Sequence, residues 1–416
     1  MHERDEEPRR GGTSSAASRP GSGFATRAVR AGQAADEATG AHATPIYQTS
    51  TFVLGSVERG SKMFDGLEPG DVYSRVGNPT VHAAEEKLAA LEGAEAAVGF
   101  ASGMGAIAAL FISTLKAGDE VLYLGPLYGG TRGLLHDLLP RFGISARSVT
   151  DAGLAAAVSP ATRLIYAETP TNPTLAIHDL AAMAAVAKRH GLLTAVDNTF
   201  ATPWLTRPLE LGVDVVLHSA TKYLGGHGDL VGGFAAGSTG LMAEVRSEGL
   251  RHVGAVLDPH AAFLLLRGMR TLHLRMAAHC SNARAVANAL RDVPGVAAVH
   301  YPGFTDHPGH AVAARQMADF GGMVSVEFKG GRPAAATFLD SLRLVDHAVS
   351  LGDVASLACV PAASTHQLLP PDVRSAHGIS EALVRISVGV EDEADLVADV
   401  VQAALAAARV ADAVPG

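Results

Sequence analysis

The feature that most constrains the fold is a repeated order of a short apolar run followed by a helical stretch, which begins near residue 96. Each run is apolar almost throughout, as expected for a strand that is buried on both faces of a sheet. The predicted strands are residues 96–100, 120–124, 163–168, 192–197 and 213–218. The predicted helices between them are residues 106–116, 131–141 and 180–190, followed by Gly118, Gly143 and Gly191 where a helix C-terminal glycine would lie. This alternation predicts an α/β fold, with a mostly parallel sheet and helices on both of its faces.

The rest of the chain divides around this core. Residues 1–22 mix charged residues with Gly, Ser and Pro, and we interpret them as a disordered tail. Residues 23–77 do not follow the alternation and are interpreted as an N-terminal arm, whereas residues 78–273 hold the alternating pattern. Residues 274–416 are interpreted as a smaller α+β C-terminal domain that ends in a helix rich in Ala and Val. Its other predicted elements are a helix at 276–291 and strands at 323–328 and 384–390.

The composition excludes several classes of protein. The chain has 416 residues and is 48% hydrophobic, which is too apolar for a disordered protein. Its formal net charge of −9 argues against a nucleic-acid partner, because phosphate binding needs an excess of Lys and Arg. No stretch reaches the roughly 18 to 20 apolar residues of a membrane-spanning helix, so no membrane partner is predicted. The two cysteines, Cys280 and Cys359, are far apart in sequence and are interpreted as reduced thiols of a cytoplasmic protein.

Polar residues follow the ends of the predicted strands. In an open parallel sheet, ligands bind at the edge where the carboxyl ends of the strands lie. The residues at this edge are Ser102, Gly103, Tyr128, Asn172, Asp197, Ser219, Thr221 and Lys222. Packing alone does not explain polar groups at successive strand ends, so the sequence predicts a ligand site there.

Lys222 is the candidate for covalent chemistry at this edge. A lone lysine at a strand end is usually an ordinary exposed residue, but Ser219 and Thr221 beside it carry hydroxyls suited to a phosphate. Lysine is the residue that condenses with a carbonyl cofactor, and partial burial lowers the pKa of its amine so that it can act as a nucleophile and then as a base. These neighbours favour the chemical role over the structural one.

Asp197 and Gly103 extend the same hypothesis. A carboxylate at the end of a strand either caps the next helix or pairs with a protonated pyridine nitrogen and so maintains the ring as an electron sink. Residues 100–106 pass from a strand into a helix through small side chains, and Gly103 there lets the backbone approach a phosphate at a helix N-terminus. The chain lacks the glycine fingerprints of a dinucleotide site or a P-loop.

No metal site is predicted. The histidines considered are His227, which follows Lys222, and the pair His307 and His310 in a loop rich in Pro and Gly. None of them has a carboxylate or a second histidine at the spacing of helical metal ligands, so structural or solvent-facing roles are favoured.

Four further motifs are highly specific: Tyr73-Ser-Arg-Val-Gly-Asn-Pro-Thr, Glu168-Thr-Pro-Thr-Asn-Pro-Thr, Val196-Asp-Asn-Thr-Phe and Ser219-Ala-Thr-Lys-Tyr. With them the chain resembles the Cys/Met-metabolism (trans-sulfuration) family of pyridoxal-phosphate enzymes over residues 24–408. The resemblance implies a fold-type I structure with an arm, a seven-stranded cofactor domain and a smaller C-terminal domain. It also implies pyridoxal 5'-phosphate as the cofactor and a homotetramer built from two tight dimers.

The resemblance also implies roles for single residues. Lys222 is similar to the Schiff-base lysine and Asp197 to the partner of the pyridine nitrogen. The residues similar to the phosphate-binding set are Gly103, Met104, Ser219 and Thr221, and Ser102 beside them is also expected to bind the cofactor. Tyr73 and Arg75 resemble residues that reach the phosphate from the neighbouring subunit.

Tyr128 matches the tyrosine that stacks on the cofactor ring, and the resemblance makes it, with Lys222, a catalytic residue that protonates the departing group. Asn172 matches a residue near the phenolic oxygen of the cofactor. Arg385 resembles the arginine that binds the substrate carboxylate, a task suited to a bidentate guanidinium, and Ser350 lies at the neighbouring position.

Within the family, the sequence favours a γ-lyase that converts methionine or homocysteine to 2-oxobutanoate, ammonia and a thiol. Val349 stands where the synthases and cystathionine lyases commonly carry Glu, and an apolar residue there suits a small thioether. Against the methionine γ-lyase branch, Gly130 stands where those enzymes have Cys, and residues 168–174 are closer to the cystathionine enzymes. Cystathionine γ-synthase, cystathionine γ-lyase and O-acylhomoserine sulfhydrylase stay open as alternatives, as does a catalytically silent binding protein, which the intact set of site residues argues against.

Overall fold

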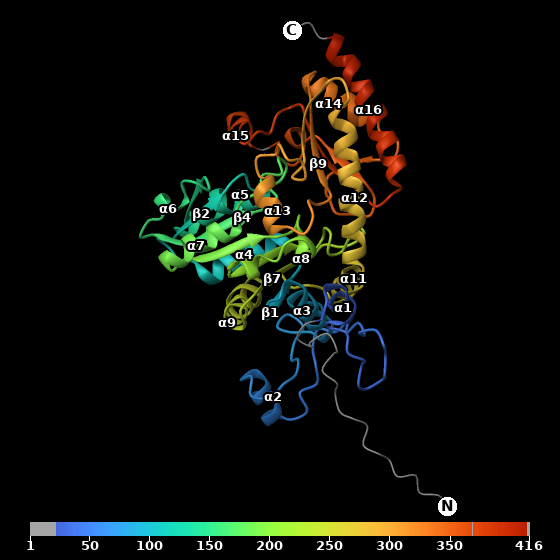
Figure 1. The fold of residues 1–416 in the computed structure, drawn as a ribbon. Coiled ribbons are helices and arrows are strands. Elements are labelled where there is room, and N and C mark those ends of the chain that lie inside the picture. The colour runs from blue at the N-terminus through green and yellow to red at the C-terminus, as the bar shows by residue number, and fades with distance from the viewer. Residues whose placement is uncertain (1–21, 368, 414–416) are drawn as a thin grey trace, which may run out of the picture.

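The structure is a computed structural model that describes residues 22–367 and 369–413, so the predicted tail lies outside the described residues apart from Ser22. Its centre is a seven-stranded sheet with the order β1-β7-β6-β5-β4-β2-β3 (Figure 1). The strands are β1 (Ala96–Phe100), β2 (Glu120–Leu124), β3 (Ser145–Val149), β4 (Thr162–Glu168), β5 (Leu193–Asp197), β6 (Val215–Ser219) and β7 (Gly233–Gly237). Strand β7 runs antiparallel to both of its neighbours, and the other pairs are parallel. The predicted mostly parallel sheet is confirmed, and each predicted strand lies within two residues of an observed one.

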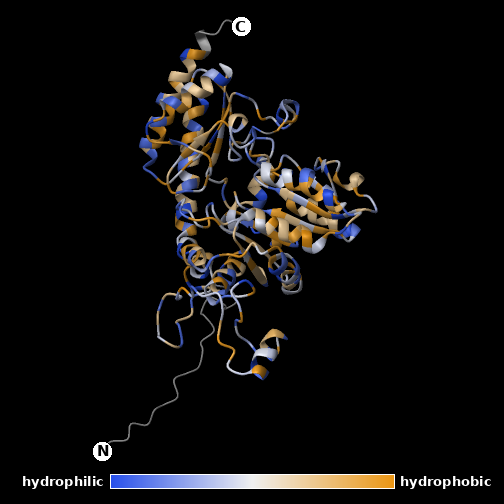
Figure 2. Ribbon diagram, turned by 180° about the vertical axis from the view of Figure 1, so that it is seen from behind, coloured by the Kyte–Doolittle hydropathy of each residue, from blue (hydrophilic) through white to orange (hydrophobic). Residues whose placement is uncertain are grey.

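Alternate side chains of each strand enter different hydrophobic clusters, which is why both faces of the sheet are covered. Tyr166 of β4 packs in the cluster that contains α4, whereas Ile165 and Ala167 pack in the cluster that contains α7. The helices around this sheet are α3 (Pro79–Glu92), α4 (Gly103–Thr114), α5 (Gly129–Gly133), α6 (Leu154–Ala157), α7 (Leu180–His190), α8 (Thr202–Leu205), α9 (Thr239–Glu244), α10 (Arg251–Val253) and α11 (Pro259–Met269). Figure 2 shows that the strands between these helices are mainly hydrophobic.

Two helical predictions are corrected by the structure. Residues 131–141 are not one regular helix: α5 continues as a π-helical turn, Leu134–Leu138, and a 3-10 helix, Leu139–Phe142. Pro140 has no backbone N–H to donate, which prevents a regular α-helix there. Gly143 and Gly191 do end their helices with φ of 73° and 64°, but α4 ends earlier, at Thr114, and Gly118 belongs to the turn that follows.

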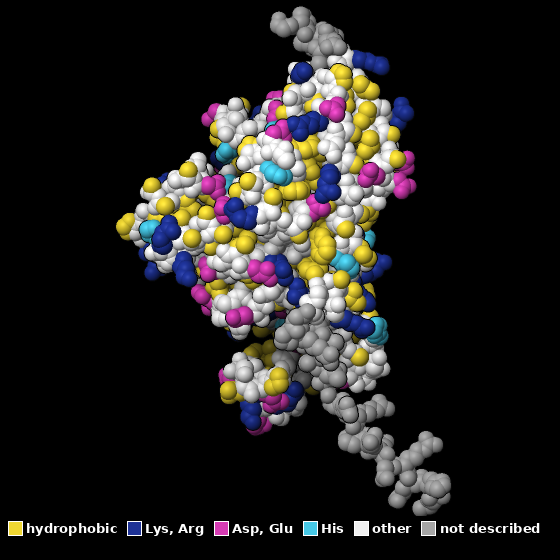
Figure 3. Space-filling model, in the orientation of Figure 1, with side chains coloured by type: hydrophobic (Ala, Val, Ile, Leu, Met, Phe, Trp, Pro, Cys, Tyr) yellow, Lys and Arg dark blue, Asp and Glu magenta, His cyan; other side chains and the backbone are white. Residues whose placement is uncertain are grey.

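The N-terminal arm starts packed against the core at the fully buried Ala28 and then projects from the body of the molecule. It carries α1 (Phe24–Arg30) and α2 (Val57–Phe64), and in Figure 1 α2 stands apart from the sheet. Large hydrophobic side chains are exposed on this segment, with Val53, Val57 and Leu67 exposed to 90%, 86% and 77%. Figure 3 shows hydrophobic side chains at the surface of the same projecting part.

The C-terminal part forms a second sheet, with the order β10-β11-β12-β9-β8, that packs against helices. Its strands are β8 (Val296–His300), β9 (Met323–Phe328), β10 (Asp346–His347), β11 (Leu357–Cys359) and β12 (Leu383–Ser387). Its helices are α12 (Leu272–Arg291), α13 (His310–Gln316), α14 (Gly331–Ser341), α15 (Pro371–Ala376) and α16 (Glu393–Ala413). The predicted α+β character is confirmed. Among the described residues, no helix is both long enough and apolar enough to cross a membrane.

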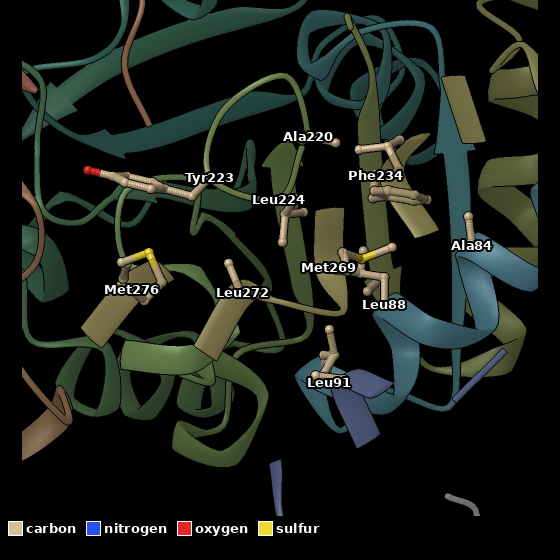
Figure 4. Packing of buried hydrophobic residues seen from close by; sticks show 14 of the residues in the cluster. Ala84, Leu88, Leu91, Ala220, Tyr223, Leu224, Phe234, Met269, Leu272 and Met276 are labelled. Atoms are coloured by element: carbon tan, nitrogen blue, oxygen red, sulfur yellow. The ribbon is translucent and has the colours of Figure 1, made fainter. Parts of the chain in front are cut away.

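One hydrophobic cluster joins the large sheet to α12 and to the helix that follows the arm. Its members come from α3, from the chain after β6, from β7, and from α11 and α12 (Figure 4). Ten of them are Ala84, Leu88, Leu91, Ala220, Tyr223, Leu224, Phe234, Met269, Leu272 and Met276. Because Tyr223 directly follows Lys222, this packing fixes the backbone on which Lys222 is carried.

A buried polar group under the sheet gives a first prediction. Glu92 of α3 and His218 of β6 have fully buried side chains, with Glu92 Oε1 2.5 Å from His218 Nε2, and Asn198 Nδ2 donates to the same oxygen at 3.0 Å. We expect Glu92→Ala to lower the free energy of unfolding by about 3–5 kcal/mol, because it leaves two buried polar groups without their acceptor. The measurement is the free energy of unfolding from a urea titration. The exposed Glu86 on the same helix supplies the control, since Glu86→Ala should change this free energy by less than about 0.5 kcal/mol. Equal effects of the two substitutions would contradict the prediction.

Candidate active site

A cavity of about 340 Å³ lies at the edge formed by the carboxyl ends of the parallel strands. Residues of the large sheet and of the C-terminal part both line it. The sequence-predicted site residues that line it are Ser102, Gly103, Met104, Tyr128, Asn172, Asp197, Ser219, Thr221, Lys222, Ser350 and Arg385. The fold therefore brings together every predicted site residue except Tyr73 and Arg75.

One end of the cavity is suited to an anion. Helix α4 begins there, and Ser102 caps it by accepting a hydrogen bond from the Gly105 N–H at 3.0 Å. Gly103 lies directly against Ser219, where a Cβ atom would be 2.8 Å from the Ser219 Cβ. The first N–H groups of a helix lack partners within the helix, and the helix dipole is positive at this end. Main-chain donors thus lie near the Ser219 and Thr221 hydroxyls, and this close approach leaves no room for a side chain at position 103.

Asp197 ends β5 at another wall of the cavity. Its Oδ1 accepts the Thr199 N–H at 2.9 Å. Burial raises the pKa of the Asp197 carboxyl above its usual value, while Thr199 and the nearby His218 oppose that change. A cationic group in the cavity would supply the missing stabilisation of the carboxylate.

The Lys222 amine stands between the large sheet and the C-terminal part. Its Nζ donates to the Ser350 Oγ at 2.6 Å. Burial, and then the positive charge of Arg385, lower the pKa of Lys222 to about 8. Ser350 adopts φ of 96°, a left-handed conformation that is uncommon for residues other than Gly, so the contact with Lys222 is made by a constrained side chain.

Arg385 lies on β12, only 2% exposed, and its hydrogen bonds go to neutral groups. Nη1 donates to Asn172 Oδ1 at 2.9 Å, and Nη2 donates to the Ser350 carbonyl at 2.8 Å. The Nε is buried and has no hydrogen-bond partner in the described part of the chain. A buried guanidinium at a cavity whose partners are uncharged is a ready site for a carboxylate.

Tyr128 lies at the start of α5, with its side chain 43% exposed. Its ring edge faces Gly130, where a Cβ atom would be 2.7 Å from Tyr128 Cε1 and 2.9 Å from Met104 Sδ. The absence of a side chain at position 130 therefore leaves room for the ring beside Met104.

Tyr73 and Arg75 do not line this cavity. They belong to the arm, where Tyr73 is 44% exposed and the Arg75 guanidinium lies 5.7 Å from the centre of the Tyr73 ring. Arg75 Nη1 donates to the Arg251 carbonyl at 2.8 Å. Within one chain, then, the predicted phosphate contacts of these two residues are not formed.

Other residues line the cavity that the sequence did not single out: Ile107, Pro170, Thr199, Phe200, Val231, Leu351 and Thr365. Glu168, noted only as the first residue of a motif, is also in the wall. Glu168 ends a predicted strand as Asp197 does, and this position at a strand end could have identified it as a site residue. Thr365 comes from a segment far away in sequence, for which the alternating pattern gave no signal.

The histidines considered for a metal make local contacts. His227 Nδ1 lies 2.8 Å from the Gly225 carbonyl, and His310 Nδ1 lies 2.9 Å from the Pro302 carbonyl. His307 Nδ1 accepts the Gly309 N–H at 3.1 Å. Within residues 22–367 and 369–413, no group of three or more His, Cys, Asp or Glu side chains is arranged to hold a metal ion.

Comparisons with known proteins agree with this geometry. Residues 25–405 match the family described as Cys/Met metabolism PLP-dependent enzyme. An L-methionine gamma-lyase of Pseudomonas putida is 48% identical over 390 residues, which cover 93% of this chain and 98% of that protein. An O-succinylhomoserine sulfhydrylase of Pseudomonas aeruginosa is 44% identical, covering 91% of this chain and 94% of that protein. The crystal structure of cystathionine gamma-lyase from Lactobacillus plantarum, complexed with L-serine, has a TM-score of 0.88 at 41% identity and covers 93% of this chain and all of that one.

The donor set of the cavity fits pyridoxal phosphate. The cofactor needs an anion site, a carboxylate for its ring nitrogen and an amine that bonds to its aldehyde. Gly103 at the start of α4, Asp197 at the end of β5 and Lys222 after β6 offer these three groups around one cavity. Site chemistry, fold and sequence match thus agree, and this chain belongs to the Cys/Met metabolism family of PLP-dependent enzymes.

Proposed function

We propose that the enzyme eliminates the γ-substituent of methionine or homocysteine, consuming one water and giving 2-oxobutanoate, ammonia and a thiol. The observation that carries the proposal is the meeting of Lys222 and Arg385 at Ser350, because it puts an amine and a carboxylate-binding group in one cavity. Val349, beside Ser350, adds an apolar wall suited to a thioether. Six curated relatives named L-methionine gamma-lyase are 43–49% identical to this chain.

The residues divide the work as follows. Bound pyridoxal phosphate supplies an aldehyde and an electron-withdrawing ring. Asp197 would pair with the ring nitrogen, and Asn172 would lie near the phenolic oxygen. The start of α4 and nearby hydroxyls would hold the phosphate, and the residues concerned are Ser102, Gly103, Met104, Ser219 and Thr221, all of which line the cavity.

Substrate handling falls to four residues. Arg385 binds the α-carboxylate, and Ser350 orients both this arginine and the Lys222 amine. The free amine of Lys222 would remove the proton at Cα and move protons between Cα and Cβ. Tyr128 would stack on the ring and give a proton to the sulfur that departs from Cγ.

A panel of substrates tests the proposal. Purified enzyme is incubated with methionine, homocysteine, cystathionine and O-acylhomoserines, with and without an added thiol. Release of 2-oxobutanoate and a volatile thiol from methionine supports the lyase. Thioether formation from an ester would instead identify a γ-replacement transferase, the alternative favoured by the similarity to the sulfhydrylase and by Gly130 in place of Cys. Cleavage of cystathionine alone would identify a cystathionine γ-lyase.

The titration of Lys222 gives a second prediction. In the apoenzyme, the rate at which pyridoxal phosphate labels Lys222, trapped with borohydride, should rise with pH to a midpoint near its pKa of about 8, because only the unprotonated amine is a nucleophile. Arg385→Met removes a nearby positive charge and should move the midpoint to higher pH, though burial should keep the midpoint below the ordinary lysine pKa of 10.5. A wild-type midpoint at that ordinary lysine value would contradict the assigned environment.

We further propose a cytoplasmic homotetramer, a dimer of dimers, in which Tyr73 and Arg75 complete the neighbouring subunit's site. Two observations support an assembly role for residues 23–77. Hydrophobic side chains of the arm are exposed, and this pair does not line the cavity of its own chain. Residues 78–273 would then be the cofactor domain and residues 274–416 the C-terminal domain. The free, buried thiols of Cys280 and Cys359 suit a reducing compartment. Sedimentation analysis of the holoenzyme tests the tetramer, and mixing Arg75→Ala with Lys222→Ala protein should restore activity if sites are shared.

A further inference from the structure

Glu168 is a buried carboxyl in the cavity wall to which the roles above assign no task. It is the last residue of β4 and stands in register with Asp197 on the neighbouring strand β5. The residue is 5% exposed. Two carboxyl groups side by side in a poorly solvated site have a high energetic cost when both are charged, because like charges repel strongly where water is excluded.

The contact that distinguishes Glu168 is with the main chain of Tyr128. Its Oε2 accepts the Tyr128 N–H at 2.8 Å, while the Tyr128 carbonyl accepts the Arg132 N–H at 3.0 Å. Both main-chain groups of Tyr128 are therefore held, and its φ and ψ of −51° and 137° are fixed at the point where α5 begins. The direction in which the ring leaves the backbone follows from these two hydrogen bonds, and the space over Gly130 accepts the ring edge.

We propose that Glu168 is a positioning residue for Tyr128, which it holds through the amide so that the ring lies over the cofactor and its hydroxyl reaches the departing sulfur. The proposal rests on the function proposed above for Tyr128. It assigns the two carboxyls separate tasks: Asp197 would pair with the ring nitrogen, and Glu168 fixes the residue that would cover the ring.

The surroundings of Glu168 disfavour the charged form of its carboxyl. Burial, and then the charge of Asp197, raise the pKa of Glu168 well above its usual value, whereas its hydrogen bond with Tyr128 and the hydroxyls of Thr131 and Tyr166 oppose that change only in part. Its other oxygen, Oε1, is buried without a hydrogen-bond partner in the described part of the chain. Accepting one N–H requires an oxygen but no charge, so a glutamine amide can replace this carboxyl.

Three substitutions test the proposal. Glu168→Gln keeps an acceptor oxygen and should stay within about threefold of the wild type, while Glu168→Leu has nearly the same size but leaves the buried Tyr128 N–H unsatisfied and should lower kcat by about 10- to 100-fold. KM should change less than kcat, since Arg385 is untouched. Glu168→Asp shortens the side chain by one methylene, which moves the acceptor away from the Tyr128 N–H, and should also lower kcat. This variant keeps the test valid if the leucine variant does not fold.

The second readout is the dissociation constant of pyridoxal phosphate from the apoenzyme, which should rise for Glu168→Leu and not for Glu168→Gln. In a Tyr128→Ala background, Glu168→Leu should have little further effect on kcat or cofactor affinity, because residues that act as a unit are not additive. Three results would overturn the proposal: a leucine variant like the wild type, a glutamine variant as impaired as the leucine variant, or additive effects with Tyr128→Ala. Failure of the proposed function is distinguishable, because the wild type itself would then release no 2-oxobutanoate from methionine or homocysteine, whereas a transferase of the same family would still be labelled at Lys222.

Discussion

Replacing Lys222 with Ala should reduce the release of 2-oxobutanoate by about 10⁴-fold or more, the largest loss expected of any single substitution. The amine is both the group that bonds to the cofactor and the base that moves protons on the substrate, and alanine retains neither function. Its place in the cavity, with Nζ 2.6 Å from Ser350 Oγ and a pKa lowered to about 8, is suited to both tasks. The measurement is the initial rate of 2-oxobutanoate release, together with peptide mapping after borohydride treatment in the presence of cofactor.

Lys188 supplies the control for this experiment. It is an exposed lysine in the last turn of α7, so Lys188→Ala should leave both the rate and the labelled peptide unchanged. The assignment fails if borohydride labels a lysine other than Lys222, or if Lys222→Ala protein retains more than about a tenth of the wild-type rate, since a general base alone contributes at least about 10²-fold.

Replacing Arg385 with Leu should lower kcat/KM by about 10²- to 10⁴-fold, mainly through KM. Two charge-assisted hydrogen bonds to the substrate carboxylate are lost, each contributing about 1.5–3 kcal/mol. Arg385 also fixes Asn172 and Ser350 through its Nη atoms, so part of the loss should come from the displacement of these neighbours.

Arg385→Lys separates charge from geometry, because an ammonium keeps the charge but cannot pair with a carboxylate through two parallel N–H groups. We expect the kcat/KM of Arg385→Lys to lie between that of Arg385→Leu and that of the wild type. Arg343, exposed in the C-terminal part, is the control, and Arg343→Leu should leave KM unchanged. If Arg385→Leu bound methionine as well as the wild type, the carboxylate site would lie elsewhere.

The strands that could be predicted from sequence are those buried on both faces, since burial makes them continuously apolar. Strand β3 escaped prediction because it lies at the edge of the sheet, where Ser145, Arg147 and Ser148 are tolerated. Strand β7 escaped for the opposite reason: it is buried throughout but begins and ends in glycine. Gly233 has to be glycine, because a Cβ atom there would lie 2.2 Å from the Ser102 carbonyl oxygen. That requirement comes from a neighbour far away in sequence and cannot be read from local propensity.

The candidate site was predictable where chemistry follows strand ends. The residues predicted in this way are Ser102, Gly103, Tyr128, Asn172, Asp197, Ser219, Thr221 and Lys222, and all of them line one cavity. Only the family resemblance pointed to Met104, to Arg385 on the smaller sheet and to Ser350 in a loop of the C-terminal part. The contact between Glu168 and the Tyr128 amide was not predictable, since it depends on the path that the chain takes after β2.

A single short loop of the C-terminal part binds both the Lys222 amine and the Arg385 guanidinium. Ser350 receives the Lys222 amine on its hydroxyl and the Arg385 guanidinium on its carbonyl, while a Cβ atom at Gly352 would fall 2.6 Å from the Tyr223 nitrogen. Because Arg385 and Ser350 belong to the same part as the smaller sheet, rotation of that sheet away from the larger one would carry both of them away from the Lys222 amine. Protein engineers who loosen this loop to admit bulkier amino acids should find that selectivity and speed decline together. Val349, 55% exposed at the cavity wall, offers a place to reshape the entrance while leaving that linkage intact.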